Sequence, residues 1–278
     1  MNFIKTLKNL VIYLFFPLGI ILFSFRREYL LLAGIIIIYF TVFFLFKKED
    51  IYKMMAGYYD KNKNTNKALK RMYDAYKVKK SSMNTANQFI YLLLKSGKYD
   101  KCGEIINEVS NREMKEKDKE ILLTNKALYL WKKNLISESI SLYEQITENH
   151  KSTAVYTAYG YVITLGDDID KALKLNLEAY EYNKDSKGIM DNLALSYMKA
   201  GDLDKSYDLY MKLLEKKPAF PEAYYNMALL MQLKGELTDA RYYLGKALEL
   251  PFNGLSTVSK QEVEKKLDYI KRLQGNLS

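Results

Sequence analysis

Residues 221–251 read PEAYYNMALLMQLKGELTDARYYLGKALELP, and this stretch decides the fold that we expect. Shifted back by 34 residues, it superposes on residues 187–220, KGIMDNLALSYMKAGDLDKSYDLYMKLLEKKPAF. The matching pairs are Asn192 with Asn226, Ala194 with Ala228, Gly201 with Gly235, and Ser206 with Ala240. A self-similarity of this length predicts a unit of two helices that stacks on its neighbours.

The small residues of this stretch stand where two helices have to approach each other. A bulky side chain in place of Ala228 or Ala240 would hold the helices apart. Gly235 permits the left-handed backbone that ends the first helix, and Pro251 cannot continue the second. We therefore expect Ala228, Ala240 and Ala247 to be buried and Gly235 to form the turn.

The pattern resembles the tetratricopeptide repeat, a helix-turn-helix unit. The resemblance implies a right-handed α-α superhelix in which each helix pair buries its apolar face against the next pair. Fidelity to the pattern falls toward the N-terminus, but six units tile residues 49–254: 49–82, 83–116, 120–152, 153–186, 187–220 and 221–254. In residues 255–278, an apolar stripe along Lys260–Leu273 predicts a helix that caps the last repeat.

The first 48 residues differ from the rest of the chain. Two apolar runs, 9–25 and 29–46, have 17 and 18 residues and are separated by Arg26, Arg27 and Glu28. Each is close to the length that a helix needs to cross a bilayer. A cleaved signal peptide is disfavoured because no small-x-small cleavage site follows the first run. We expect an all-α protein: a two-helix transmembrane hairpin, a solenoid and a capping helix.

Basic residues follow the hairpin in the sequence. The residues that we expect near the membrane surface are Lys47, Lys48, Lys67, Lys70, Arg71, Lys77, Lys79 and Lys80. Their side of the hairpin is the cytoplasmic one by the positive-inside rule, which predicts a multi-pass protein of the cell membrane. The basic stretch fits anionic lipid better than nucleic acid, and an ordinary solvated helix face is an equal alternative. The sequence leaves open whether the second apolar helix continues unbroken into the first repeat.

No residue constellation argues for catalysis or for a bound metal or cofactor. The chain has one histidine, His150, in a polar loop, where we expect it to be solvated. Its one cysteine, Cys102, stands at a small-residue position and is expected to be buried. Phosphate-binding loops and spaced Cys or His pairs are missing from the sequence. We therefore expect a protein that is not an enzyme.

The resemblance implies a working surface on the concave face, which the first helix of each unit lines. Amide side chains recur there at Gln88, Asn125, Asn192 and Asn226. An asparagine can bridge the backbone of an extended peptide, although a local structural role is an equal alternative. The neighbouring positions are apolar or aromatic: Tyr91, Leu128, Trp131, Tyr161, Leu195, Tyr225, Leu229 and Leu233. An exposed strip of this kind predicts a partner site.

Together these features predict a bacterial membrane-anchored scaffold that binds a peptide or helix of another protein in its concave groove. Anchoring would keep the partner near the membrane and raise its effective concentration. Two alternatives stay open. The solenoid could only brace the assembly of a membrane complex, or the same scaffold could face the extracytoplasmic side. The sequence names neither the partner nor the oligomeric state.

Overall fold

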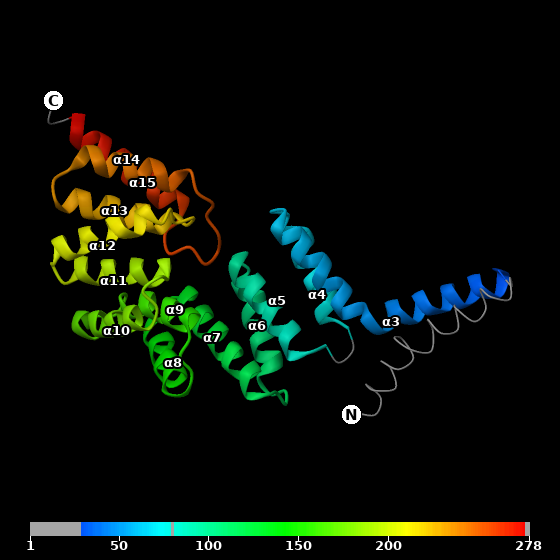
Figure 1. The fold of residues 1–278 in the computed structure, drawn as a ribbon. Coiled ribbons are helices and arrows are strands. Elements are labelled where there is room, and N and C mark those ends of the chain that lie inside the picture. The colour runs from blue at the N-terminus through cyan, green and yellow to red at the C-terminus, as the bar shows by residue number, and fades with distance from the viewer. Residues whose placement is uncertain (1–28, 79–80, 276–278) are drawn as a thin grey trace. The chain divides into compact units, whose positions relative to one another are not determined.

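The computed structural model describes residues 29–78 and 81–275, and within them the protein is all-α, with thirteen helices and no strand (Figure 1). The helices are α3 (Tyr29–Lys61), α4 (Thr65–Tyr76), α5 (Met83–Lys95), α6 (Tyr99–Ser110), α7 (Glu116–Lys132), α8 (Ile136–Asn149), α9 (Thr153–Ile163), α10 (Ile169–Tyr182), α11 (Lys187–Lys199), α12 (Leu203–Glu215), α13 (Pro221–Leu233), α14 (Leu237–Leu248) and α15 (Lys260–Gly275). The chain divides inside α5 into unit 1, residues 1–89, and unit 2, residues 90–278. The expected all-α fold is confirmed.

Unit 1 is built on α3, a single helix of 33 residues. No proline interrupts it, so the apolar stretch continues without a break into the first repeat. The next helix, α4, packs back against α3. Ala56 of α3 and Ala68 and Ala75 of α4 are buried, and such small side chains let two helices approach closely. The Asn64 side chain accepts a hydrogen bond from the Lys67 backbone N–H and so caps α4.

The predicted transmembrane hairpin is not shown by the structure. Its first helix, 9–25, lies outside the described residues. In the part of the chain that is described, no helix has both the length and the apolar character needed to cross a membrane.

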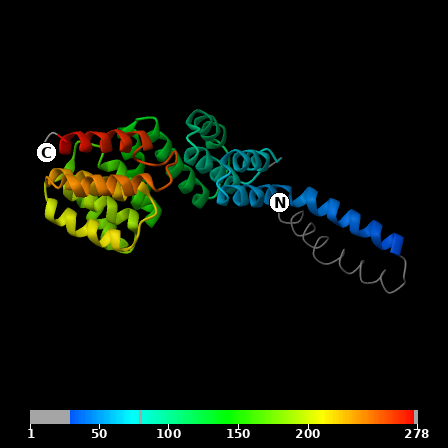
Figure 2. The ribbon, with the colours of Figure 1, turned by 90° about the horizontal axis from the view of Figure 1, so that it is seen from above.

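Unit 2 consists of helix pairs joined by tight turns. The pairs α7–α8, α9–α10, α11–α12 and α13–α14 follow one another, and α13, α14 and α15 run side by side (Figures 1 and 2). The backbone is left-handed at Gly201 and Gly235, as the repeat pattern predicted. At the α7–α8 turn Asn134 takes the same conformation, with φ 62°. Asparagine tolerates this region better than most residues, so the turn forms without glycine.

Small residues allow the two helices of a pair to pack closely. Ala228, Ala240 and Ala247 are buried, which confirms their expected role as helix contacts. At Gly160 of α9 the approach is closer still, because a Cβ atom there would lie 2.2 Å from the Asn176 side-chain oxygen. Val263 of α15 is fully buried in an apolar cluster shared with residues of α13 and α14, so α15 covers part of this end of the unit.

Among the described residues, the two larger apolar clusters of unit 2 are a C-terminal core and a middle core, and Tyr156, Ala179 and Ile189 form a smaller third cluster. The C-terminal core comprises Met190, Leu193, Ala194, Leu209, Tyr210, Leu213, Ala223, Met227, Ala228, Leu230, Met231, Ala240, Leu244, Ala247, Val258, Val263 and Ile270. The middle core comprises Ala127, Tyr143, Ile146, Val155, Tyr159, Val162, Ile163 and Ala172. These cores fix the spacing of α7, α9, α11 and α13, whose other faces line the candidate site.

Candidate functional site

A groove of about 790 Å³ lies in unit 2. Helices α7, α9 and α11 supply most of its lining, and the first turn of α13 supplies Glu222. Tyr91 of α5 and three loop regions complete it. These are the connection from α8 to α9, which carries His150, the connection from α12 to α13, which carries Phe220, and the connection from α14 to α15, which carries Leu255 and Thr257. The groove thus lies on the first helices of successive pairs, where the resemblance placed the working surface.

Six of the twelve predicted partner-binding residues line this groove: Tyr91, Asn125, Leu128, Trp131, Tyr161 and Asn192. The other six lie elsewhere: Gln88, Leu195, Tyr225, Asn226, Leu229 and Leu233. Gln88 belongs to unit 1, where its amide donates to the Asn84 side chain at 3.1 Å. Leu195 is buried in the interior, whereas Leu233 is 62% exposed. Partner contact by any of the twelve stays a prediction.

The predicted asparagine ladder has a structural role at two of its positions. Asn192 of α11 donates to the Thr157 carbonyl of α9 at 2.7 Å. Asn226 of α13 donates to the Asp191 carboxylate of α11 at 3.2 Å. These amides therefore connect the first helices of neighbouring pairs. Asn125 is also buried, and it lines the groove.

An aromatic wall occupies one side of the groove. The rings of Trp131 and Tyr161 meet edge to face, with centroids 5.3 Å apart. The Lys132 ammonium lies over the Trp131 ring, 4.0 Å from its centroid. Burial raises the pKa of Tyr161 to about 12, against the opposing effect of its hydrogen bond with Thr257. Leu128 and Phe220 extend this apolar lining.

The charged side chains that line the groove are acidic: Glu120, Asp191 and Glu222. No lysine or arginine is among the described residues that line it, although the chain carries a net charge of +10. Glu120 lies 3.1 Å from His150 Nδ1. Burial raises the pKa of Asp191 to about 7, and the hydrogen bond from Asn226 opposes this shift. The lining therefore suits a ligand that is apolar or cationic.

The partner-binding residues predicted from the sequence did not include these acids or the histidine. Asp191 is the fifth residue of the 187–220 unit, which matches the position of Tyr225 in the following unit. The position of Asp191 within its unit could therefore have identified it as a groove residue. His150 lies in a loop with its side chain 37% exposed, and it also lines the groove and contacts Glu120. No sequence motif could have identified Leu255 and Thr257, because the connection that carries them is irregular.

Within the described residues, neither the cysteine nor a metal-ligating cluster adds a second candidate site. Cys102 is buried, as expected, and burial raises the pKa of its thiol to about 12. Among the described residues, no cluster of three His, Cys, Asp or Glu side chains could hold a metal ion.

The basic residues of unit 1 lie on α3, α4 and the turn that follows α4. Lys48, Lys67, Lys70 and Lys77 are exposed, Lys47 and Arg71 are half-buried, and Lys79 and Lys80 lie outside the described residues. Several of these cations pack on tyrosines of their own unit, such as Lys67 over Tyr59 at 5.5 Å. Arg71 also pairs with Asp74 at 3.1 Å. Lipid contact by this set stays a prediction.

Comparison with known proteins supports the repeat type. Residues 209–249 match the family model described as tetratricopeptide repeat. The chain is similar to the Photosystem I assembly protein Ycf3 of Prochlorococcus marinus, at 32% identity over 104 residues in one strain. That match covers 36% of this chain and 60% of the relative. In a second strain the identity is 30% over 108 residues, covering 38% and 62%. The chain thus spans about three fifths of the length of these relatives.

Two solved structures share the fold. One is TTC0263, a tetratricopeptide-repeat protein of Thermus thermophilus, with a TM-score of 0.55 and 15% identity, covering 68% of this chain and 98% of that one. The other is PilF of Pseudomonas aeruginosa, with a TM-score of 0.54 and 13% identity, covering 80% and 99%. At such identities the likeness shows the helical-repeat fold alone.

Proposed function

We propose that unit 2 is a protein-interaction module whose groove binds an extended segment of a partner protein. The observation that carries this proposal is the lining itself, which joins an aromatic and aliphatic wall to three acidic side chains. Such a surface binds by burying apolar side chains and excluding water. The proposal therefore assigns a non-covalent activity to the protein.

The size and charge of the groove narrow the kind of segment that fits. A volume of about 790 Å³ is within the range of pockets that hold drug-sized ligands, so it suits a few side chains of a peptide rather than a folded domain. Glu120 and Glu222 favour a lysine or arginine among those side chains, and Asp191, whose pKa is raised to about 7, adds to this when it is ionised. Because Asn192 and Asn226 already bond within the solenoid, we assign selectivity to shape and charge rather than to an asparagine ladder.

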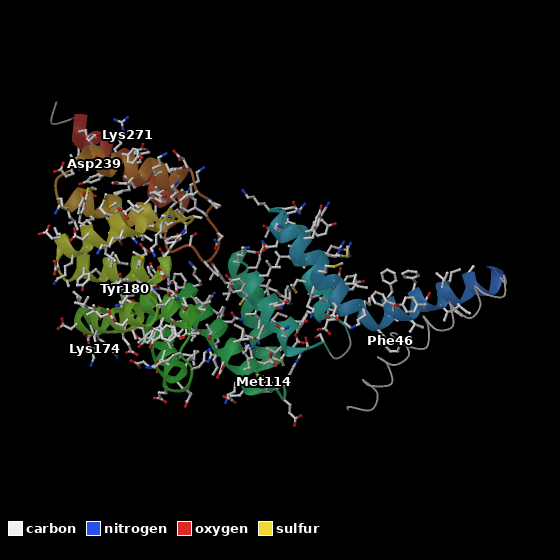
Figure 3. The ribbon with its side chains drawn as sticks, in the orientation of Figure 1. Phe46, Met114, Lys174, Tyr180, Asp239 and Lys271 are labelled. Carbon is white, nitrogen blue, oxygen red and sulfur yellow. The ribbon has the colours of Figure 1, made fainter. Side chains whose placement is uncertain are left out.

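We propose in addition that the N-terminal region attaches the protein to the cell membrane, with unit 2 on the cytoplasmic side. Two apolar runs at 9–25 and 29–46 support this, as does the exposed apolar surface of α3, where Ile37 and Leu45 are 66% and 70% exposed. Figure 3 shows Phe46 on the same helix. Membrane fractionation tests the attachment, and an export-dependent reporter enzyme fused after Ser278 tests on which side of the membrane unit 2 lies. Reporter activity would contradict the cytoplasmic placement.

The names of the similar proteins suggest a class of partner. The relatives from Prochlorococcus marinus are named as assembly proteins of photosystem I. From these names we take only the general role of assembly. We propose that the partner of this protein is a subunit that is being assembled into a membrane complex. The competing proposal is that the solenoid merely braces such a complex, in which case the groove stays empty.

Site-specific photocrosslinking distinguishes binding from bracing. A benzoylphenylalanine at position 121 places the crosslinker on the groove, whereas one at position 177 places it on α10, outside the groove lining. Ile121 and Leu177 are both 39% exposed, so the two positions are matched in accessibility. We expect one defined partner to crosslink at position 121 in native membranes and not at position 177. Equal yields at both positions would contradict groove binding.

A further inference from the structure

The connection between α14 and α15 returns across unit 2 to the end of α5 (Figures 1 and 2). We call its residues Asn253–Thr257 the clasp. The Gly254 backbone N–H donates to the Lys95 carbonyl at 2.8 Å. The Tyr99 hydroxyl donates to the Gly254 carbonyl at 2.6 Å. Both main-chain groups of one residue are therefore held by residues more than 150 positions earlier in the chain.

Two further bonds fasten the other end of the clasp. The Lys132 ammonium, at the end of α7, donates to the Ser256 carbonyl at 2.7 Å. The Thr257 backbone N–H donates to the buried Glu222 carboxylate of α13 at 2.8 Å. Hydrogen bonds with a charged partner are stronger than neutral ones, so these two are the stronger fastenings. The clasp thus joins α5, α6, α7 and α13.

Gly254 fits its place because it has no side chain. A Cβ atom there would lie 2.2 Å from the Leu94 carbonyl oxygen and 2.4 Å from the Gly97 nitrogen. Both are backbone atoms and cannot rotate away as the end of a flexible side chain can. At Gly245 of α14, by contrast, a Cβ atom meets nothing within 4 Å. This difference provides a matched pair of substitutions.

The clasp borders the groove and does not fill it. Leu255 and Thr257 are part of the lining, yet about 790 Å³ remains open beside them. We infer that the clasp is one wall of the partner site and that it opens to admit the segment and then closes over it. This inference rests on the proposed function. Leu255 and Thr257 are then partner-contacting residues that the repeat pattern does not supply.

The fold allows the clasp to open without wider unfolding. Five hydrogen bonds to other elements hold it, the fifth between the Thr257 and Tyr161 side chains. By contrast, α15 on one side is anchored by the fully buried Val263 and Ile270. On the other side, α14 is anchored by Leu244 and Ala247 in the C-terminal core. Segments with few buried contacts open locally at low free energy while the packed helices stay formed.

The first test compares Gly254→Ala with Gly245→Ala in the full chain. In Gly254→Ala, we expect the backbone amide hydrogens of residues 254 and 257 to exchange with solvent about tenfold faster than in the wild type. The amides of α15 should exchange at the wild-type rate. Trp131, the only tryptophan of the chain, reports on the same place because Lys132 lies over its ring and binds the clasp. Its quenching by acrylamide should rise in Gly254→Ala and stay at the wild-type value in Gly245→Ala.

A second variant distinguishes opening of the clasp from a general folding defect. Tyr99→Phe removes only the hydroxyl that binds Gly254, so it should shift exchange and quenching in the same direction by a smaller factor. Wild-type exchange at residues 254 and 257 in Gly254→Ala would overturn the clasp as a held element. Faster exchange throughout α13, α14 and α15 would overturn its independent opening.

The last arm tests the clasp as a wall of the partner site. We expect the crosslinking yield at position 121 to fall about threefold or more in Gly254→Ala relative to Gly245→Ala, because the opened groove is less preorganised. An unchanged yield with an open clasp would overturn this role. A wild-type chain that gives no crosslink at position 121 would instead overturn the proposed function, while the exchange result on the clasp would still stand.

Discussion

The C-terminal core and the middle core of unit 2 are built from the same kind of helix pair but are filled with different side chains. The C-terminal core is mostly aliphatic, with Met190, Met227 and Leu244 in its interior. The middle core instead contains Tyr143 and Tyr159 stacked at 5.4 Å. Most of the C-terminal core lies within residues 209–249, which match the repeat family, whereas most groove residues belong to α7 and α9, which also contribute to the middle core. The residues that match the repeat family therefore mainly pack the interior, whereas the groove lies mostly on helices outside that match.

The largest expected effect tests whether the aliphatic core dominates stability. Leu213 is fully buried in the C-terminal core, and Leu213→Ala should lower the free energy of unfolding by about 2–5 kcal/mol. The control is Leu233→Ala, at a 62% exposed position, which should change it by less than about 0.5 kcal/mol. Urea denaturation of both variants measures the difference. Equal losses would mean that the assigned core does not carry the fold.

The second prediction concerns Asp191, which lies between the C-terminal core and the groove. Burial raises its pKa to about 7, so between about pH 4 and 7 the native state holds a proton that the unfolded state has released. Stability should therefore fall as pH rises through this window, by at most about 1.4 kcal/mol per pH unit. Asp191→Asn should remove that part of the slope. Urea titrations at several pH values check this, and an unaltered slope in the variant would contradict it.

The third prediction exchanges the packing of one core for that of the other. Gly160 and Ala194 are both the eighth residue of their units, so Gly160→Ala copies the C-terminal residue into the middle pair. The added Cβ would lie 2.2 Å from the Asn176 side-chain oxygen, and we expect a loss of about 1–3 kcal/mol. Gly245→Ala, where the space is open, is the control. A neutral Gly160→Ala in thermal unfolding would show that the two pairs tolerate the same packing.

The smallest expected effect compares two buried tyrosines. The Tyr210 hydroxyl donates to the Asp191 carbonyl at 3.4 Å, whereas the Tyr143 hydroxyl has no hydrogen-bond partner within the described part of the chain. Tyr210→Phe should cost about 0.5–1.5 kcal/mol, and Tyr143→Phe should be neutral or stabilising. Chemical denaturation of the two variants in parallel measures the difference. The reverse order would contradict the assignment of polar contacts in the two cores.

The sequence predicted the all-α repeat fold because its signals are local. Helical periodicity, the glycine turns and the buried alanines all lie within one unit, so a single pair of units discloses them. Half of the predicted partner-binding residues line the groove, and partner contact by the amides stays a prediction. Asn192 and Asn226 direct their donors to the neighbouring unit, and a pattern of residue types does not reveal which partner an amide takes.

The clasp could not be predicted for a different reason. Its hydrogen bonds join Gly254 to Lys95 and Tyr99, at a separation that no periodic pattern encodes. The acids of the groove are an intermediate case. Glu222 and Asp191 stand at register positions on the first helices of their units, so the repeat pattern could place them. The acidic character of the groove also requires that no described lysine or arginine lines it, and the pattern does not predict this.

The central claim, that the groove holds a partner segment, is tested most directly by amide hydrogen exchange. The full chain would be measured alone and then saturated with the peptide segment captured at position 121. Binding in the groove predicts slower exchange in α7, α9 and α11 and in residues 253–257, with α8, α10 and α12 unchanged. Protection confined to α8, α10 and α12 would place the partner on the second helices of the pairs and contradict the claim.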